Sequence, residues 1–272
     1  MWQDHEVRFD VDAKMLRLAM GEFTIDRIEN IEDTKGNNGD RGIMRVTNLR
    51  LIWHANAMPR INLSIGLFCI QGIRVQKTNS RLRGETEATF ITAKGNATRF
   101  EFVFTALSSG TTASRLFSTI NSIHRAYETT KLYRELKMRA PILDDNEQLR
   151  VMPGEQQVER LQGVWNLSSE QGNLGVMITT TLRVIWFASM NHLYNVSIPY
   201  LQLVSCRIRD SKFGLALVLE TSPQSGEYVL GFRVDPEERL RSLCKSVQSL
   251  QKAHAIKPFY GISVRREKAV RD

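Results

Sequence analysis

The heptapeptide TNLRLIW at Thr47–Trp53 returns in the second half of the chain as TTLRVIW at Thr180–Trp186. When the chain is aligned on these two peptides, residues 21–77 and 154–210 match without a gap and share sixteen identities. Chance alone gives roughly three or four identities over such a length, on ordinary residue frequencies. The chain is therefore predicted to contain two copies of one structural unit.

Apolar and polar residues alternate along much of each unit. The alternation is clearest at Phe100, Phe102 and Phe104 in the first unit and at Leu215, Leu217 and Leu219 in the second. A period of two predicts half-buried antiparallel strands. Segments rich in Asn and Gly, such as residues 35–42, separate these runs and are typical of hairpin turns, because both residues tolerate positive φ.

Near the end of each unit the apolar period becomes helical. The apolar positions are Leu116, Ile120, Ile123 and Tyr127 within residues 113–137, and Leu240, Leu243, Val247 and Leu250 in the second unit. This spacing predicts an amphipathic helix with one apolar face, and Pro141 marks where the first helix must have ended. Each unit is thus predicted to hold about seven short strands and one C-terminal helix that plugs the open end of a two-sheet sandwich.

This arrangement is that of the pleckstrin-homology (PH) superfold, and the T-x-L-R-[LV]-I-W hairpin after a G-x-x-G loop resembles GRAM and related PH-like domains. Longer strings resemble the family of PH-repeat subunits of the BBSome, the Bardet–Biedl syndrome protein five family. They include VTNLR, RFEFVFT and HRAYET in the first unit and NVSIPYLQ and RDSKFGLALV in the second. The resemblance runs from Trp2 to Gly261. It implies a mainly β fold with C-terminal helices (α+β), in which two tandem PH-like seven-stranded sandwiches are each capped by one helix.

The resemblance and the linker signals together predict the domain boundaries. We expect a first PH-like domain at residues 1–140, a linker at 141–148, a second PH-like domain at 149–261 and a basic tail at 262–272.

The composition indicates a globular protein with anionic partners. The chain carries 37 Lys and Arg against 29 Asp and Glu, a net charge of +8, which favours nucleic acid, acidic lipid or an acidic protein surface. Cys69, Cys206 and Cys244 form no CxxC motif, which is typical of a reducing compartment such as the cytosol or nucleus. No secretory signal is visible, and no stretch approaches the roughly 20 apolar residues of a membrane span.

No motif in the chain predicts catalysis or a metal centre. The histidines, His5, His54, His124, His192 and His254, form no HxxxH or HExxH pattern. Neither a G-x-S-x-G motif nor a phosphate-binding P-loop occurs. The cysteines fall in strand-like or helix-like segments, where thiols are usually buried and inert. We therefore expect no enzymatic activity, no cofactor and no bound metal.

The loops of the first unit carry the candidate ligand site. Gly36, Gly39 and Gly42 are able to bring backbone amides close to a phosphate, although three glycines also simply shape a long hairpin. In PH domains the inositol-phosphate pocket is walled by the first, third and sixth inter-strand loops. The resemblance therefore implies a lipid-binding site formed by Lys35, Arg41, Arg60, Lys94 and Arg99, because guanidinium and ammonium groups suit phosphates. The implied ligand is a phosphoinositide headgroup on a peripheral membrane, with phosphatidylinositol 3-phosphate the lipid that the family leads us to expect.

The second unit provides a comparison. Its corresponding loops hold Ser168, Glu170 and Leu174, then residues 191–193, then residues 222–227, and they contain no Lys or Arg. We predict that this pocket does not bind a phosphoinositide in the same way and instead suits protein contact. Arg50 and Arg183 repeat across the units. We expect them to be structural, at exposed strand positions whose stems pack over Trp53 and Trp186.

The resemblance implies a non-catalytic adaptor subunit of the BBSome coat for ciliary membrane-protein trafficking. Its partners are then other BBSome subunits, and its locations are the cytoplasm, cilium, ciliary membrane and basal body. One alternative is a purely structural scaffold subunit with occluded lipid pockets. Another is a chromatin- or nucleic-acid-associated PH-like repeat protein, which the basic composition permits. The basic loops contain no aromatic stacking platform, so no nucleic acid is expected.

Overall fold

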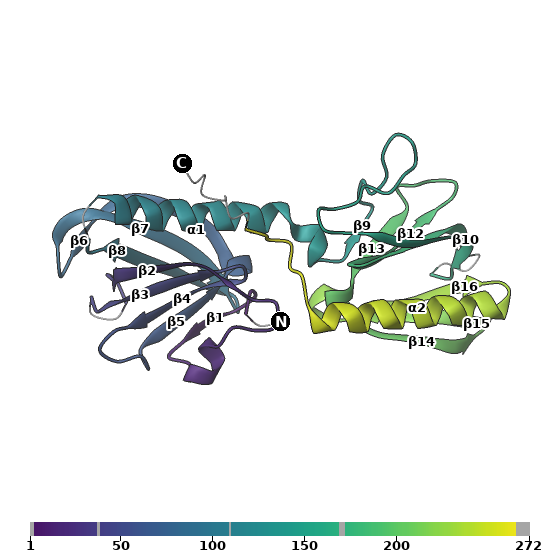
Figure 1. Ribbon diagram of the computed structural model, residues 1–272, viewed down its shortest axis with the longest axis horizontal. Helices are drawn as coiled ribbons and strands as arrows, with labels where there is room; N and C mark the ends of the chain where they lie inside the picture. Colours follow the sequence, from purple (N-terminus) through teal and green to yellow (C-terminus); the bar gives the residue numbers. More distant parts are fainter. Residues whose placement is uncertain (1–2, 37–38, 109, 169–171, 265–272) are drawn as a thin grey trace, which may run out of the picture. The chain divides into compact units, whose positions relative to one another are not determined.

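The structure is a computed structural model that describes residues 3–36, 39–108, 110–168 and 172–264. It divides into two compact units, whose strands and helices are labelled in Figure 1. The first unit runs to Thr130 and takes in Ile262, and the second runs from Lys131 to Gly261. The tail expected from residue 262 therefore begins with a core residue of the first unit, and from residue 265 it lies outside the described residues.

The second unit thus starts before the segment that the sequence suggested as a linker. Tyr133 and Arg134 are buried. The Tyr133 hydroxyl donates to the carbonyl of Pro153 at 2.7 Å, and Arg134 Nη1 donates to the carbonyl of Tyr260 at 2.6 Å. These contacts place residues 131–140, which we expected in the first domain, with the second unit.

The first unit is an eight-stranded antiparallel sheet followed by one long helix. Its strands are β1 (Val7–Phe9), β2 (Thr24–Asp33), β3 (Arg41–Thr47), β4 (Arg50–Ala55), β5 (Asn62–Gly66), β6 (Ile70–Ser80), β7 (Gly84–Gly95) and β8 (Thr98–Ala106), and its helix is α1 (Thr111–Thr129). The strand order is β1-β5-β4-β3-β2-β8-β7-β6. Two single-turn 3-10 helices, Ala13–Leu16 and Leu67–Cys69, lie within the unit.

The second unit repeats this plan. Its strands are β9 (Lys137–Met138), β10 (Gln157–Asn166), β11 (Asn173–Thr180), β12 (Arg183–Ala188), β13 (Asn195–Pro199), β14 (Leu203–Ser211), β15 (Gly214–Thr221) and β16 (Val229–Val234), and its helix is α2 (Glu237–Ile256). The strand order is β14-β15-β16-β10-β11-β12-β13-β9. Short 3-10 helices occur at Lys131–Tyr133, Tyr200–Gln202 and Pro223–Ser225.

The predicted fold class is confirmed: two mainly β units, each with seven repeated strands and a C-terminal helix. Each unit also carries one strand that the sequence did not predict. β1 pairs with β5 and β9 pairs with β13, so each sheet gains a strand at the same edge. β1 and β9 are only three and two residues long, too short for alternation to reveal them.

In each unit, one long strand pairs with a different neighbour on each of its two edges. β2 pairs with β3 along most of its length and with β8 at its end, and β10 does the same with β11 and β16. The register of β2 shifts between Ile28 and Ile31, around Asn30 with a φ of 57°. The matching shift in β10 surrounds Gly163 with a φ of 78°. Asn and Gly are the residues that adopt this conformation most readily, so both copies bend at the same bulge.

A tryptophan anchors each core. The indole Nε1 of Trp53 donates to the carbonyl of Ile31 at 3.0 Å, and that of Trp186 donates to Val164 at 3.0 Å. Both rings are buried, and each lies against a glycine of the neighbouring strand. The two halves therefore share the same internal packing as well as the same strand order.

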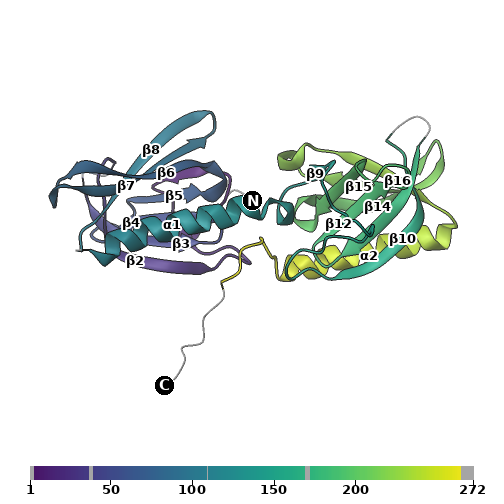
Figure 2. The same ribbon diagram turned by 90° about the horizontal axis from the view of Figure 1, so that it is seen from above.

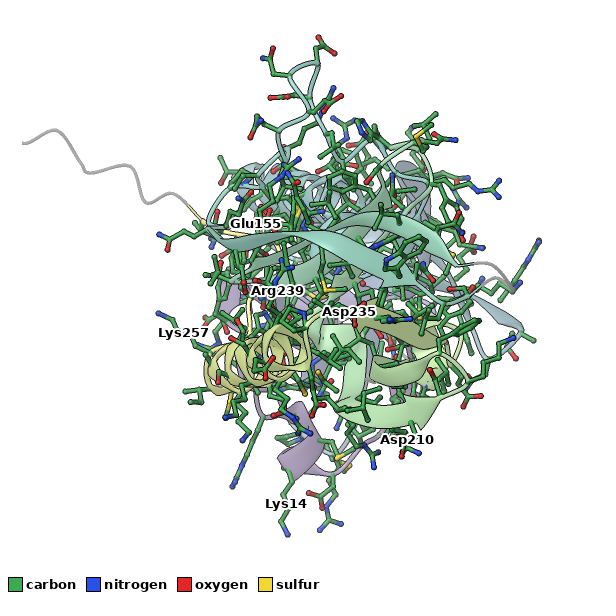
Figure 3. The ribbon with its side chains drawn as sticks, turned by 90° about the vertical axis from the view of Figure 1, so that its right-hand side faces the viewer. Lys14, Glu155, Asp210, Asp235, Arg239 and Lys257 are labelled. Atoms are coloured by element: carbon green, nitrogen blue, oxygen red, sulfur yellow. The ribbon has the colours of Figure 1, made fainter. Side chains whose placement is uncertain are left out.

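The helices cover the sheets with the predicted apolar faces. α1 buries Leu116, Ile120, Ile123 and Tyr127, and α2 buries Leu240, Leu243 and Val247. Figure 2 shows each helix running along its own sheet. At the start of α2, Arg239 donates to the carbonyls of Asp235 and Gln162, each at 3.2 Å, and so ties the helix to β10 (Figure 3).

The first helix is shorter than its apolar pattern suggested. It ends at Thr129, whereas residues 113–137 were expected to be helical. The hydroxyls of Thr129 and Thr130 donate to carbonyls of the preceding turn, among them that of Ala126. Such bonds compete with helix continuation. Within the described residues, no helix is both long and apolar enough to cross a lipid bilayer.

Candidate ligand-binding site

Three loops of the first unit meet at one end of the sheet. They connect β2 to β3, β4 to β5 and β7 to β8, as the sequence analysis expected. The β2–β3 and β4–β5 loops are joined by a bond from the amide of Asn56 to the carbonyl of Arg41 at 2.9 Å. The β7–β8 loop is a tight turn in which Asn96 and Ala97 both have positive φ. We call this end of the first unit the first mouth.

Lys35 is already paired with a carboxylate that the sequence analysis did not identify. Its Nζ donates to Oε1 of Glu101 at 2.8 Å, while Nη2 of Arg74 donates to Oε2 of the same residue, also at 2.8 Å. The bonds from Lys35 and Arg74 lower the pKa of Glu101 below its ordinary value. Glu101 is therefore an ionised bridge between two cations at neutral pH.

Two of the five predicted cations line one hollow. A space of about 460 Å³ is bordered by Lys35, Arg99 and Glu101, together with the polar side chains of Gln71 and Thr92. Polar and cationic groups on one concave surface are what an anionic ligand requires. The structure thus brings Lys35 and Arg99 together.

The other three predicted cations do not border that hollow. Lys94 faces Arg99 across the β7–β8 hairpin, while Arg41 and Arg60 lie on the other two loops. All three side chains are exposed. They form the rim of the first mouth and add to its positive charge, but they do not converge on a single point with Lys35.

The added strand β1 narrows the first mouth. A second hollow, of about 300 Å³, is lined by Phe9, Lys35, Leu63 and Phe100 among others. The ring of Phe9 lies 5.4 Å from that of Phe100 and 6.0 Å from that of Phe102. An aromatic side chain therefore forms part of the wall of this hollow, and it remains 47% exposed.

The second unit has a corresponding hollow with a different lining. It measures about 320 Å³ and is bordered by Met138 from β9, by Ser168 and Val196, and by Tyr228 and Val229. Ile31 pairs with Ala106 in the first unit, and its counterpart Val164 pairs with Val234 in the second. These pairs align the β7–β8 hairpin with the β15–β16 hairpin. On that correspondence Ser168 stands where the first unit has Lys35, and Val229 stands where it has Glu101. We call this end of the second unit the second mouth.

The exchange extends to all five predicted cations. In chain order, Lys35, Arg41, Arg60, Lys94 and Arg99 correspond to Ser168, Leu174, Leu193, Ser222 and Glu227. Two of the replacements are apolar and exposed, since Leu174 is 43% and Leu193 64% accessible, and the neighbouring Met190 is 97% accessible. The first mouth therefore carries five cations that the second lacks, and the second exposes apolar side chains at two of those positions.

The arginines that repeat across the units are buried, and the expectation that they lie exposed over the tryptophans is wrong. Arg50 and Arg183 form ion pairs inside the protein with Glu22 and Glu155. Thr47 and Thr180 donate to the same two carboxylates at 2.8 Å. These residues fix the hairpin that defines the repeat and are not available to a ligand.

The cysteines of the chain lie in the protein interior. Cys69, Cys206 and Cys244 are free and buried, and the Sγ atoms of Cys206 and Cys244 lie 3.9 Å apart. Burial raises the pKa of the Cys206 thiol. Across the described ranges, His, Cys, Asp and Glu form no group of three or more that could hold a metal ion.

The fold and its two loop ends define a tandem PH-like protein. Residues 22–129 match the N-terminal PH-like domain of Bardet-Biedl syndrome 5 protein, and residues 137–264 match its second PH-like domain. The chain belongs to the Bardet-Biedl syndrome 5 protein family.

Curated relatives match almost the whole chain. BBSome complex member bbs-5 of Caenorhabditis elegans is 58% identical over 98% of this chain and 75% of its own length. BBSome complex member BBS5 of Mus musculus is 53% identical over 98% of this chain and 77% of its own length. The corresponding protein of Danio rerio is 52% identical, with the same coverage as the mouse protein.

Proposed function

We propose that this protein is a non-catalytic adaptor subunit of a BBSome-type coat for ciliary membrane-protein trafficking. In this proposal the first mouth binds a phosphoinositide headgroup and the second mouth contacts a partner protein. The observation that carries both parts is the exchange of five cations in one unit for serines, leucines and a glutamate in the other. The folds are the same, so this difference in charge is the main chemical difference between the two mouths.

The lipid part of the proposal is supported by the cationic rim of the first mouth. Each Lys or Arg near an anionic leaflet contributes about 1 kcal/mol of attraction. Five such residues give modest affinity, so binding within a larger coat supplies the remainder by avidity. The expected headgroup is that of phosphatidylinositol 3-phosphate, and the expected locations are the cytoplasm, cilium, ciliary membrane and basal body.

Flotation with vesicles that contain phosphatidylinositol 3-phosphate tests the lipid part. The Lys35→Ala/Arg41→Ala variant is expected to lose most of the binding. A matched control, Lys245→Ala/Lys252→Ala, removes the same charge from exposed positions on α2 of the second unit. Equal binding by the first variant and the wild-type protein would discard the lipid function.

The protein part is supported by the exposed apolar side chains around the second mouth. Exposed apolar groups that gather at one place are typical of interaction surfaces. Because the relatives are named as BBSome complex members, we propose that the partners are other BBSome subunits. Leu193→Asp is expected to weaken co-purification of those subunits, whereas Ile256→Asp, which changes a 78% exposed residue at the end of α2, should not.

A purely structural scaffold is the second candidate. Two observations favour it: Lys35 is already paired with Glu101, and the Phe9 ring lines a hollow of the first mouth. In that case subunits of the coat cover both mouths, and vesicle binding by the isolated chain disappears in the assembled complex. Flotation of the assembled complex therefore separates the two candidates.

A further inference from the structure

Glu101 lies between two basic side chains. Its Oε1 accepts a hydrogen bond from Nζ of Lys35 in the β2–β3 loop, and its Oε2 accepts one from Nη2 of Arg74 in β6, each at 2.8 Å. A third cation, Arg99, borders the adjoining hollow together with Lys35 and Glu101. Basic groups from three separate elements thus lie near one carboxylate: Lys35 and Arg74 bond to it, and Arg99 borders the same hollow as Lys35.

A phosphate monoester presents the same kind of acceptor with more oxygens and more negative charge than a carboxylate. We propose that Lys35, Arg74 and Arg99 form a phosphate subsite, and that Glu101 is its internal occupant, which an incoming phosphate group displaces. The inference rests on the proposed lipid function and deepens it. It places the phosphate beside Glu101 and not in the hollow of the first mouth that Phe9 lines, and it adds Arg74 to the site. It also gives Glu101 a role as an internal competitor.

The geometry around Arg74 supports this position. Its guanidinium lies over the ring of Phe90, 5.1 Å from the ring centre, and this contact holds the group in place. About half of each basic side chain is exposed, 58% for Lys35 and 47% for Arg74, so a ligand can reach both. The hollow at the first mouth, in contrast, is lined by the rings of Phe9, Phe100 and Phe102.

The second unit holds a similar carboxylate without the subsite. Glu220 accepts bonds from Arg207, which repeats Arg74, and from the hydroxyl of Ser205, and Arg209 lies 3.7 Å away. Glu220 is as exposed as Glu101, 30% against 31%. However, Ser168 and Glu227 stand there in place of Lys35 and Arg99. A phosphate that displaced Glu220 would therefore not meet the same three basic side chains.

Titration of the full chain with soluble inositol 1,3-bisphosphate, and flotation with vesicles that contain phosphatidylinositol 3-phosphate, test the inference. Glu101→Gln is expected to raise the affinity for the soluble headgroup by about tenfold, on the scale of one charge-assisted contact. Glu220→Gln is the matched control and should bind as the wild-type protein does. Adding Arg74→Gln to the Glu101→Gln protein should cancel the gain.

The two probes also identify the source of the phosphate. A gain with vesicles as well as with the soluble headgroup assigns the subsite to a membrane lipid. A gain with the soluble headgroup or inorganic phosphate alone supports the subsite but assigns it to a free phosphate compound. Thermal unfolding of Glu101→Gln verifies the fold, and Glu101→Asp, which keeps the charge, should retain wild-type affinity.

Two results would overturn the inference. The first is that Glu101→Gln binds the headgroup and the vesicles as the wild-type protein does, while Lys35→Ala/Arg41→Ala loses binding. The lipid function would then stand, but Glu101 would not be a competitor of the phosphate. If neither the wild-type protein nor Glu101→Gln binds either probe, the subsite and the lipid function both fail.

Discussion

Arg50 and Glu22 form an ion pair in which neither side chain is exposed to solvent. Nε of Arg50 donates to Oε1 of Glu22 at 2.9 Å, and Nη1 and Nη2 donate to the carbonyls of Met15 and Arg17. Arg183 and Glu155 repeat the pair at 2.7 Å. Because every donor group of the Arg50 guanidinium has a partner, the buried charge is compensated, and the pair ties the start of the unit to its defining hairpin.

Removing one member of this pair should be severely destabilising. Glu22→Ala leaves the Arg50 charge buried without its counter-ion, which typically costs about 3–5 kcal/mol. Urea unfolding of the variant measures the loss, with Glu29→Ala, an exposed carboxylate, as a control within about 0.5 kcal/mol of wild type. Glu22→Leu/Arg50→Met should cost less than Glu22→Ala. The opposite order would contradict this view of the pair.

Gly42 is expected to tolerate no side chain. A Cβ there would lie 2.6 Å from the ring of Trp53 and against the backbone carbonyl of His54. Gly42→Ala should therefore lower the free energy of unfolding by about 3 kcal/mol, as overpacking does. Gly84→Ala provides the comparison, because nothing lies within 4 Å of its Cβ position and only its φ of +73° is strained, a cost of about 1–2 kcal/mol. Equal losses in thermal unfolding would refute the packing argument.

The thiols should be unreactive in the folded protein. Burial, with help from the charges of Asp4 and Glu6, raises the pKa of Cys69 to about 11. The thiolate is the reactive form, so at pH 8 almost none is present. We expect slow reaction of all three cysteines with a disulfide reagent in buffer and rapid reaction in urea. A single fast thiol in the folded state would show that one of these sites opens to solvent.

His254 should make the protein less stable in mild acid. Burial lowers the pKa of His254 below its ordinary value. Its Nε2 accepts a hydrogen bond from the amide of Phe259 at 3.3 Å, which it can do only while that nitrogen is unprotonated. The unfolded state therefore binds the proton more readily than the folded state. The stability due to neutral His254 is present above pH 6.5 and is lost as the pH falls below it. Urea unfolding at pH 8 and pH 5 should show a smaller drop for His254→Gln than for the wild-type protein.

The repeat allowed the fold to be predicted from the sequence. Trp53 and Trp186 stand at matching positions, and the strand around Phe102 and the helix face around Ile120 lie where their apolar periods placed them. Period and turn chemistry are local properties, so they can be recognised from neighbouring residues. The end of α1 at Thr129 was missed because bonds from threonine hydroxyls leave no trace in an apolar pattern.

The candidate site could be predicted only in part. The loops and their cations follow from the alignment of the two units, but the partners of those cations do not. Glu101 meets Lys35 and Arg74 across separations of 66 and 27 residues. The pairing of β2 with β8 brings Lys35 to it, and the register of β6, β7 and β8 brings Arg74. Glu22 and Glu155 did leave a signal, since both are identical across the repeat. Two conserved charges in matching positions could have indicated a buried pair.

The strand β1 has a practical consequence for anyone who divides this chain into fragments. The repeat alignment begins at Gly21, yet Asp4 accepts a bond from the Tyr127 hydroxyl at 2.7 Å inside the first unit, and Phe9 forms part of the wall of the hollow at its loop end. An excised domain that started at Gly21 would expose Tyr127 and leave a wider entrance than the intact protein has. Affinities measured on such a piece would describe a pocket that the natural polypeptide does not possess.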